Sequence, residues 1–147
     1  MEWRRGDYYI STDAARVDRD AVYTYLANSY WAAGIPRDVF ERSLDHALCF
    51  SLWHEPSASQ VGFARVITDR ATFGYLGDVY VLEAHRGHGL ARWLMQVVAE
   101  HPELQGFRRW CLLTRDAHGL YQKFGWTALA APDRWMERWD PEVYRRR

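Results

Sequence analysis

The spacing of apolar residues across the stretch 90–98 constrains the fold more than any other feature of this sequence. The residues recur at positions i, i+3, i+4, i+7 and i+8, namely Leu90, Trp93, Leu94, Val97 and Val98. This spacing places the side chains on one face of a helix. Pro102 should end the helix near His101, because the residue before a proline disfavours helical geometry. An amphipathic helix is therefore expected from Leu90 to about His101.

Strands are expected before this helix and short mixed segments after it. Residues 47–54 and 61–68 are β-prone and flank a stretch rich in turn formers, which predicts a hairpin that residues 73–82 extend into a meander. The other expected elements are strands at residues 8–12, 110–114, 126–129 and 135–139, and helices at residues 18–28, from Pro36 and at 117–124. This order predicts a mixed α/β sheet with helices on both faces. With 147 residues we expect a single domain, 1–147.

Charge and composition narrow the class of protein. Basic and acidic residues both number 19, so no basic excess supports binding to nucleic acid or to an anionic membrane. Charges interrupt every apolar stretch well before ~18 residues, and the first residues lack the apolar run of a signal peptide. Cys49 and Cys111 have apolar neighbours, which suits buried reduced thiols. We therefore expect a soluble cytoplasmic protein.

The segment 82–91 leads from an expected strand through a glycine-bearing turn into the amphipathic helix. The first backbone N–H groups of a helix lack intrahelical partners and lie at the positive end of its dipole, so this passage favours a phosphate. Gly87 and Gly89 would let the main chain approach phosphate oxygens, and Arg86 would add a cation. The alternative is an ordinary turn with a solvated arginine.

Other phosphate and metal motifs do not fit these residues. The phosphate-binding P-loop pattern is absent. Arg92 stands where a dinucleotide fingerprint needs a third glycine or alanine. His85 and His88 lack a third ligand at useful spacing, so we expect no metal.

Two motifs in this sequence resemble the GNAT superfamily of N-acetyltransferases. Arg86, Gly89 and Ala91 fit its coenzyme-A signature, Arg/Gln-x-x-Gly-x-Gly/Ala, between a strand and a long helix. About 30 residues later, Leu120 to Trp126 is similar to the family segment Leu/Phe-Tyr-x-x-x-Gly-Phe, with Trp126 replacing phenylalanine. The two motifs occur in the family order, and the resemblance covers roughly residues 48–126.

The resemblance implies a fold and a coenzyme site. The fold would be a mixed, mostly antiparallel sheet of six to seven strands, with two central parallel strands that splay apart and helices on both faces. Acetyl-CoA would be the co-substrate. Its pantetheine arm would pair with backbone groups of Val79 and Val81, and its pyrophosphate would bind the turn formed by Arg86, Gly87, His88, Gly89, Leu90 and Ala91. The family asparagine that contacts pantetheine is missing, and Asp116 or His118 would take its place.

The resemblance also implies candidate catalytic residues. Tyr121 matches the family tyrosine that gives a proton to the departing thiolate; alternatively it is a packed aromatic residue. The attacking amine must be neutral, and its pKa near ~10 calls for a base. Asp78, Glu83, Asp116 and His118 lie where the family places such groups, and the sequence does not choose among them.

The acceptor pocket of this family is built by the N-terminal helices and the late strands, which draws attention to Tyr30, Trp31 and Asp69. The two aromatic residues could instead belong to the core or to a dimer face. We expect an acetyl-CoA-dependent N-acetyltransferase acting on a small-molecule amine, with a homodimer left open. The alternatives are a non-catalytic acetyl-CoA-binding or sensor domain, and an interaction module.

Overall fold

The computed structural model describes residues 1–146 and contains one six-stranded sheet with the strand order β1-β2-β3-β4-β5-β6. The strands are β1 (Glu2–Arg5), β2 (Tyr8–Ser11), β3 (Leu48–His54), β4 (Ser59–Thr68), β5 (Phe73–Val81) and β6 (Arg109–Leu112). The first five pair antiparallel, whereas β5 and β6 are parallel. The mixed, mostly antiparallel sheet that the sequence predicted is confirmed.

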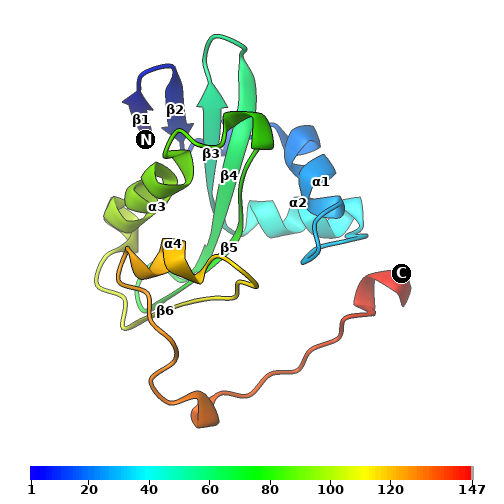
Figure 1. The fold of residues 1–147 in the computed structure, drawn as a ribbon. Helices are drawn as coiled ribbons and strands as arrows, with labels where there is room; N and C mark the ends of the chain where they lie inside the picture. The colour runs from blue at the N-terminus through cyan, green and yellow to red at the C-terminus, as the bar shows by residue number, and fades with distance from the viewer. Residues whose placement is uncertain (147) are drawn as a thin grey trace.

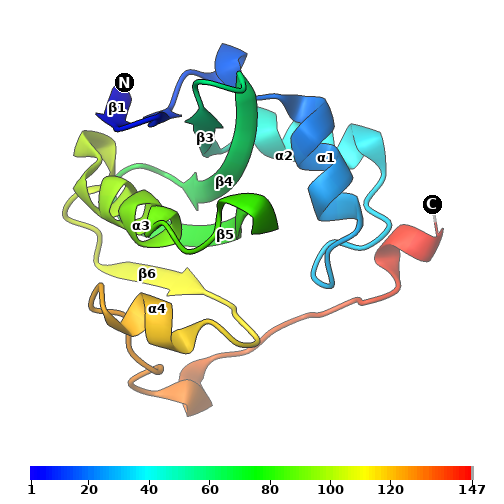
Figure 2. The same cartoon turned by 45° about the horizontal axis from the view of Figure 1, so that its top comes forward.

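Helices cover both faces of this sheet (Figure 1). The helices are α1 (Arg19–Ala27), α2 (Arg37–Asp45), α3 (Leu90–Glu100) and α4 (His118–Gln122). α1 and α2 enclose a cluster with Phe63 and Tyr80, whereas α3 and α4 pack on the other face against residues such as Phe50 and Leu52. Figure 2 shows α3 separated from α1 and α2 by the strands. Because β3 has helices on both sides, its first five residues are buried.

The helix boundaries follow from local chemistry. Asp18 accepts a hydrogen bond from the Ala21 amide at the start of α1, and Pro36 precedes α2 at the position where a missing amide proton costs least. The amphipathic helix α3 begins at Leu90 and buries all five residues of its predicted apolar face. The helix expectations at residues 18–28, from Pro36 and from Leu90 are confirmed.

Three strand assignments differ from the sequence-based expectation. Within the described chain, residues 126–129 and 135–139 form no strand, so those two predictions were wrong. A β-prone run becomes a strand only beside a partner with open hydrogen-bonding groups, and neither segment pairs with one. The strand β1 was missed because Glu2, Arg4 and Arg5 hide any apolar alternation. It forms through the turn at Gly6, which pairs it with β2.

Candidate functional site

The turn between β5 and α3 has the geometry of an anion site. Gly87 and Gly89 have φ angles of 86° and 72°, in the left-handed region that side chains with a Cβ avoid. An added Cβ at either glycine would meet nothing within 4 Å, so open space adjoins this backbone. Gly89 caps α3 without a side-chain hydrogen bond, and the first turn carries no acidic residue. The positive end of the helix therefore faces that space.

A small cavity of about 250 Å³ joins this turn to the neighbouring strand and helix. Its lining residues are Val81, Arg86, Gly87, Gly89, Leu90, Ala91, Arg92 and Leu120. Six of the predicted coenzyme residues are thus brought together. Four others, Val79, His88, Asp116 and Tyr121, do not line this cavity. Sequence reasoning missed Arg92 and Leu120, although a cation in the first turn of the helix was a readable signal for Arg92.

β5 and β6 splay apart beside this cavity. The parallel pairing joins only Phe73–Leu76 of β5 to β6, whereas the rest of β5 pairs with β4 alone. The Leu82 amide donates to Val61 O at 2.8 Å, so the alternating residues Val81 and Val79 direct their backbone polar groups away from β4. Those groups face the opening between the two strands, on the side where an extended ligand could pair with them.

The side chain of Arg86 binds within the protein. Its Nε donates to Val81 O at 2.9 Å, and its Nη2 donates to the Tyr25 hydroxyl at 3.5 Å. Tyr25 in turn stacks on Tyr80, with ring centroids 3.8 Å apart. The guanidinium is therefore held across the mouth of the splay, between β5 and α1.

Asp78 lies at an irregularity in β5 and has a φ of 56°, which redirects its side chain. Its Oδ2 accepts from Arg65 Nε at 2.7 Å, and its Oδ1 accepts from Trp31 Nε1 at 2.8 Å. The side chains of Asp78 and Arg65 are only 10% and 16% exposed. The ion pair joins β4 to β5, and the hydrogen bond from Trp31 fastens the loop that follows α1 to the centre of the sheet. Arg65 was missed because a lone arginine in a β-prone run carries no sequence signal.

Tyr121 lies on α4 and is buried. Burial raises the pKa of its phenol, and the nearby Tyr30 raises that pKa further. Tyr30 also makes an edge contact with Trp31 at 5.1 Å, and the guanidinium of Arg115 lies 3.9 Å from the centre of its ring. Contacts thus link Tyr30 through Trp31 to Asp78.

The other predicted residues lie in different surroundings. Glu83 and His118 are exposed, at the end of β5 and at the start of α4 respectively. Asp116 is exposed and faces Arg115 at 4.0 Å. His88 lies in the turn, with its ring 6.5 Å from that of Tyr8.

Asp69 has a local role in the turn after β4. Its carboxylate accepts hydrogen bonds from the amides of Ala71, Thr72 and Phe73 and from the Thr72 hydroxyl. The bond from the Thr72 hydroxyl, followed by those from the backbone, holds the pKa of this carboxyl well below its usual range. Asp69 therefore shapes the turn.

Cys49 and Cys111 are both free thiols, and burial raises the pKa of each. Among residues 1–146, no three His, Cys, Asp or Glu side chains gather into a group that could hold a metal ion. No helix in that range is long and apolar enough to cross a membrane.

Comparison with known proteins places this geometry in a family. The family model described as an acetyltransferase (GNAT) domain matches residues 45–128, more than half of the chain. A candidate acetyltransferase of Gibberella zeae is 39% identical over 144 residues, which cover 84% of this chain and 80% of that protein. A crystal structure of a candidate GNAT-family acetyltransferase from Xanthomonas campestris is 46% identical, with a TM-score of 0.90, and the match covers 93% of this chain and 96% of that one.

A more distant neighbour shares the fold alone. It is an acetyltransferase predicted in Clostridium acetobutylicum and solved with acetyl-CoA, 17% identical, with a TM-score of 0.63 over 94% of this chain and 96% of that one. The splayed strands and the glycine turn at the start of α3 are consistent with the family that these matches indicate. The chain belongs to the GNAT family of acetyltransferases.

Proposed function

We propose that this protein is an N-acetyltransferase that moves the acetyl group of acetyl-CoA onto the amine of a small molecule. The observation that carries the proposal is the open cavity at the positive end of α3, continuous with Val81 of β5 and Leu120 of α4. An anionic group and an extended arm, the two parts that coenzyme A presents, suit these surfaces.

The chain supplies the groups that would hold the coenzyme. Free amides at the start of α3 and the side chain of Arg92 would bind the pyrophosphate oxygens. Backbone groups of Val79 and Val81 would pair with the pantetheine amides. Because Arg86 occupies Val81 O, its guanidinium would turn from that carbonyl toward the phosphates on binding.

Tyr121 would act as the general acid. The amine nitrogen attacks the thioester carbon, the carbon–sulfur bond breaks, and the departing thiolate takes the phenolic proton of Tyr121. The phenol carries its proton at neutral pH, as an ordinary tyrosine does, and burial keeps it in that form. Solvent then returns a proton to Tyr121.

The amine must also lose a proton, and the two exposed groups Glu83 and His118 are the candidates we propose for the base. Asp78 is less suited because both of its oxygens already accept hydrogen bonds. We assign Asp78 a positioning role, since it holds the indole of Trp31 in place. Substituting Glu83 by Gln and His118 by Asn in turn would identify the base as the residue whose loss moves the acidic limb of the pH–rate profile.

We place the acceptor beside Tyr30 and Trp31. Aromatic faces suit an amine, and the Arg115 guanidinium lying over Tyr30 supports this because it shows that the ring attracts a cation. Asp69 is left out of this arrangement because its carboxylate is engaged in its own turn.

The test begins with calorimetric titration of the full chain with acetyl-CoA, coenzyme A and NADH, followed by thiol release with a panel of small amines. Saturable binding of acetyl-CoA without binding of NADH, together with turnover of an amine, would support the proposal. Binding without turnover of any amine would favour the non-catalytic sensor instead. No binding at millimolar acetyl-CoA would overturn both.

A further inference from the structure

Arg65 combines a nearly buried side chain with hydrogen-bonding groups that no protein atom uses. The side chain is 16% exposed, and its Nε donates to Asp78 Oδ2 at 2.7 Å. Among residues 1–146, Nη1 and Nη2 of Arg65 make no hydrogen bond, whereas every enclosed side-chain nitrogen and oxygen in that range has a partner. Both Nη atoms therefore reach solvent, and their N–H groups are open to a ligand.

Strand register shows which face of the sheet Arg65 occupies. Paired residues on neighbouring antiparallel strands lie on the same face, and Arg65 pairs with Cys49 of β3 and with Gly77 of β5. Cys49 belongs to the cluster under α1 and α2, so the guanidinium lies on that face. Apart from its chain neighbours, a Cβ added at Gly77 would meet only the ring of Tyr75 within 4 Å. The position opposite Arg65 therefore leaves space beside the guanidinium.

This uncovered surface continues from Arg65 toward β6. Tyr75 pairs with Ile67 of β4 and with Cys111 of β6, so all three lie on the same face as Arg65. Ile67 is 44% exposed, and Tyr75 and Cys111 are partly exposed. Burial raises the pKa of the Tyr75 phenol, the Asp78 carboxylate raises it further and Arg65 lowers it, which places the phenol near the ion pair. We call the surface formed by Arg65, Ile67, Tyr75, Asp78 and Cys111 the open face.

Tyr30 and Trp31, beside which we place the acceptor, border the open face. Trp31 Nε1 donates to Asp78 at 2.8 Å, and Tyr30 contacts Trp31 edge-on. The Arg115 guanidinium lies 3.9 Å from the centre of the Tyr30 ring, and the Arg115 amide donates to the Tyr30 hydroxyl at 3.3 Å. Arg115 therefore places a second cation at this border.

The charges around the open face favour a ligand with a single negative charge. Two guanidiniums, Arg65 and Arg115, face one nearly buried carboxylate, Asp78. Asp116 lies 4.0 Å from Arg115, but its side chain is 72% exposed, so water weakens that pairing. One carboxylate on the ligand would balance the excess of positive charge, whereas a phosphate group, with roughly two negative charges, would exceed it. The planar guanidinium also matches a carboxylate through two parallel hydrogen bonds.

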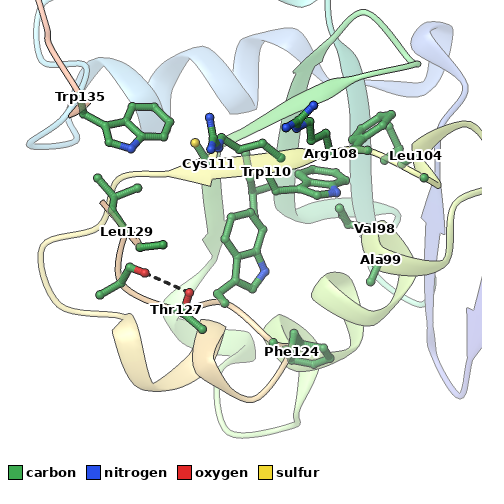
Figure 3. Close-up of a pocket in the computed structure, with 18 of the residues that line it drawn as sticks. Val98, Ala99, Leu104, Arg108, Trp110, Cys111, Phe124, Thr127, Leu129 and Trp135 are labelled. Carbon is green, nitrogen blue, oxygen red and sulfur yellow. Dashed lines mark hydrogen bonds between the residues drawn. The ribbon is translucent and has the colours of Figure 1, made fainter. Parts of the chain in front are cut away.

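A large cavity on the molecule lies apart from the open nitrogen atoms of Arg65. It has a volume of about 870 Å³ and lies between α3, β6 and the segment after α4 (Figure 3). Of the residues of the open face, only Cys111 lines it. Leu76 and Trp110, which also line it, pack in the cluster under α3. Arg65 therefore opens onto a different surface.

We propose, building on the N-acetyltransferase activity above, that Arg65 binds a carboxylate of the acceptor, so that the acetyl group goes to an amine that carries a carboxylate, as an amino acid does. Asp78 fixes the guanidinium through Nε, and both Nη atoms face the ligand. Tyr30 and Trp31 contact the rest of the acceptor. The amine nitrogen forms the amide bond as the carbon–sulfur bond breaks, with the proton transfers described above, and the carboxylate is unchanged.

The first experiment measures the acceptor selectivity of the wild-type chain by thiol release. The acceptors are leucine and phenylalanine, the amide of each, in which a neutral carboxamide replaces the carboxylate, and the phosphonate analogue of each. We expect kcat/KM for each amino acid to exceed that for its amide by about tenfold or more, because a charge-assisted pair is stronger than a hydrogen bond to a neutral group. The amine of an amide is the less basic, so amine basicity alone would favour the amide.

Equal or faster turnover of the amides would overturn the carboxylate site, and so would a preference for the phosphonates. Calorimetric titration with acetyl-CoA separates this failure from failure of the proposed function. Turnover of other amines but not of the amino acids overturns the carboxylate site alone, whereas coenzyme binding without turnover of any amine overturns both.

The second experiment uses Arg65→Lys, which keeps a positive charge beside Asp78 but removes the fork of N–H groups. We expect KM for the amino acids to rise by about tenfold, while KM for the amides and the Kd for acetyl-CoA stay unchanged. Arg70→Lys is the control, because Arg70 is an exposed arginine in the turn after β4 and pairs with Glu103. It should change none of the three constants.

A merely structural role of Arg65 would affect all acceptors alike. If Arg65→Lys raised KM for amino acids and amides equally, or for neither, Arg65 would not be the residue that binds the carboxylate. The unchanged Kd for acetyl-CoA reports that the variant is folded. Loss of folding in Arg65→Lys would leave the wild-type comparison of acids with amides as the deciding result.

Discussion

The hydroxyl of Tyr121 is protonated at neutral pH, and its ring is held in place. It is buried on α4, so its pKa is raised, and its ring is fixed by Trp126 in an edge contact at 6.1 Å. Tyr30, whose charge would influence this phenol, belongs to the loop that Asp78 holds through Trp31. At the scale of single residues, the candidate acid therefore lies near the candidate acceptor groups.

Replacing Tyr121 by Phe removes the proton donor and keeps the ring. We expect kcat to fall by about 100-fold while the Kd for acetyl-CoA changes little, because the phenol acts when the thiolate leaves. Steady-state thiol release and calorimetry measure the two quantities. Tyr144→Phe is the control, since that tyrosine is also partly buried but packs against the other face. Unchanged turnover in Tyr121→Phe would remove this residue from the acid role.

Asp78→Asn leaves Arg65 as a nearly buried charge without a charged partner. We expect the free energy of unfolding to fall by about 3 kcal/mol, because desolvation of the lone cation is no longer offset. Asparagine also tolerates the positive φ, so backbone strain does not confuse the result. Urea unfolding measures the change.

The exposed pair between Arg37 and Asp20 provides the comparison for this prediction. Asp20 is 88% exposed, so Asp20→Asn should cost less than about 1 kcal/mol. The double variant Asp78→Asn with Arg65→Met should recover part of the loss. Equal costs for Asp78→Asn and Asp20→Asn would show that burial does not strengthen the inner pair.

At the scale of elements, the passage from β5 through the turn into α3 forms the proposed coenzyme site. The strand supplies backbone groups, the glycines leave space, and the helix supplies unpaired amides and its dipole. The site depends on the splay, because β6 leaves β5 after Leu76. Side-chain identity matters less here than the path of the main chain.

Gly89→Glu tests this element directly. The substitution adds bulk and negative charge at the helix start, so we expect acetyl-CoA affinity to fall at least tenfold. Gly6→Glu is the matched control, because Gly6 also has a positive φ, 58°, and open space around it. Both variants should lose similar stability, and calorimetric titration should show that only Gly89→Glu loses binding. If Gly89→Glu and Gly6→Glu bound acetyl-CoA with equal affinity, that result would contradict the placement of the pyrophosphate at this turn.

At the scale of the whole molecule, one sheet separates two apolar clusters. Cys49 belongs to the cluster under α1 and α2, where burial raises the pKa of its thiol to about 11. An unfolded thiol ionises near pH ~8.5. The folded state therefore binds this proton more tightly, and its contribution to stability is complete below about pH 8.5 and is lost as the pH rises toward 11.

We therefore expect the free energy of unfolding to fall by about 2 kcal/mol between pH ~8 and pH ~10, from this thiol alone. Burial also raises the pKa of Tyr80, which adds to the loss at higher pH. Urea unfolding across this range measures the slope. Cys49→Ala should flatten it, whereas Cys111→Ala, at a partly buried site, should flatten it less. If the free energy of unfolding fell with pH equally steeply in the wild type and in Cys49→Ala, the pH dependence could not be assigned to Cys49.

The sequence by itself determined the main elements of this protein and the position of the glycine turn for which we propose coenzyme binding. The spacing of apolar residues defined α3, and turn-forming residues separated β3 from β4. The residues from Arg86 to Ala91 marked the start of α3. The sequence could show these features because each is a local pattern. Tertiary structure alone decided the rest. It paired Asp78 with Arg65 and Trp31, tied Arg86 to Val81, and left residues 126–129 and 135–139 without a strand partner. These outcomes depend on which distant groups meet in space, and no local pattern records that.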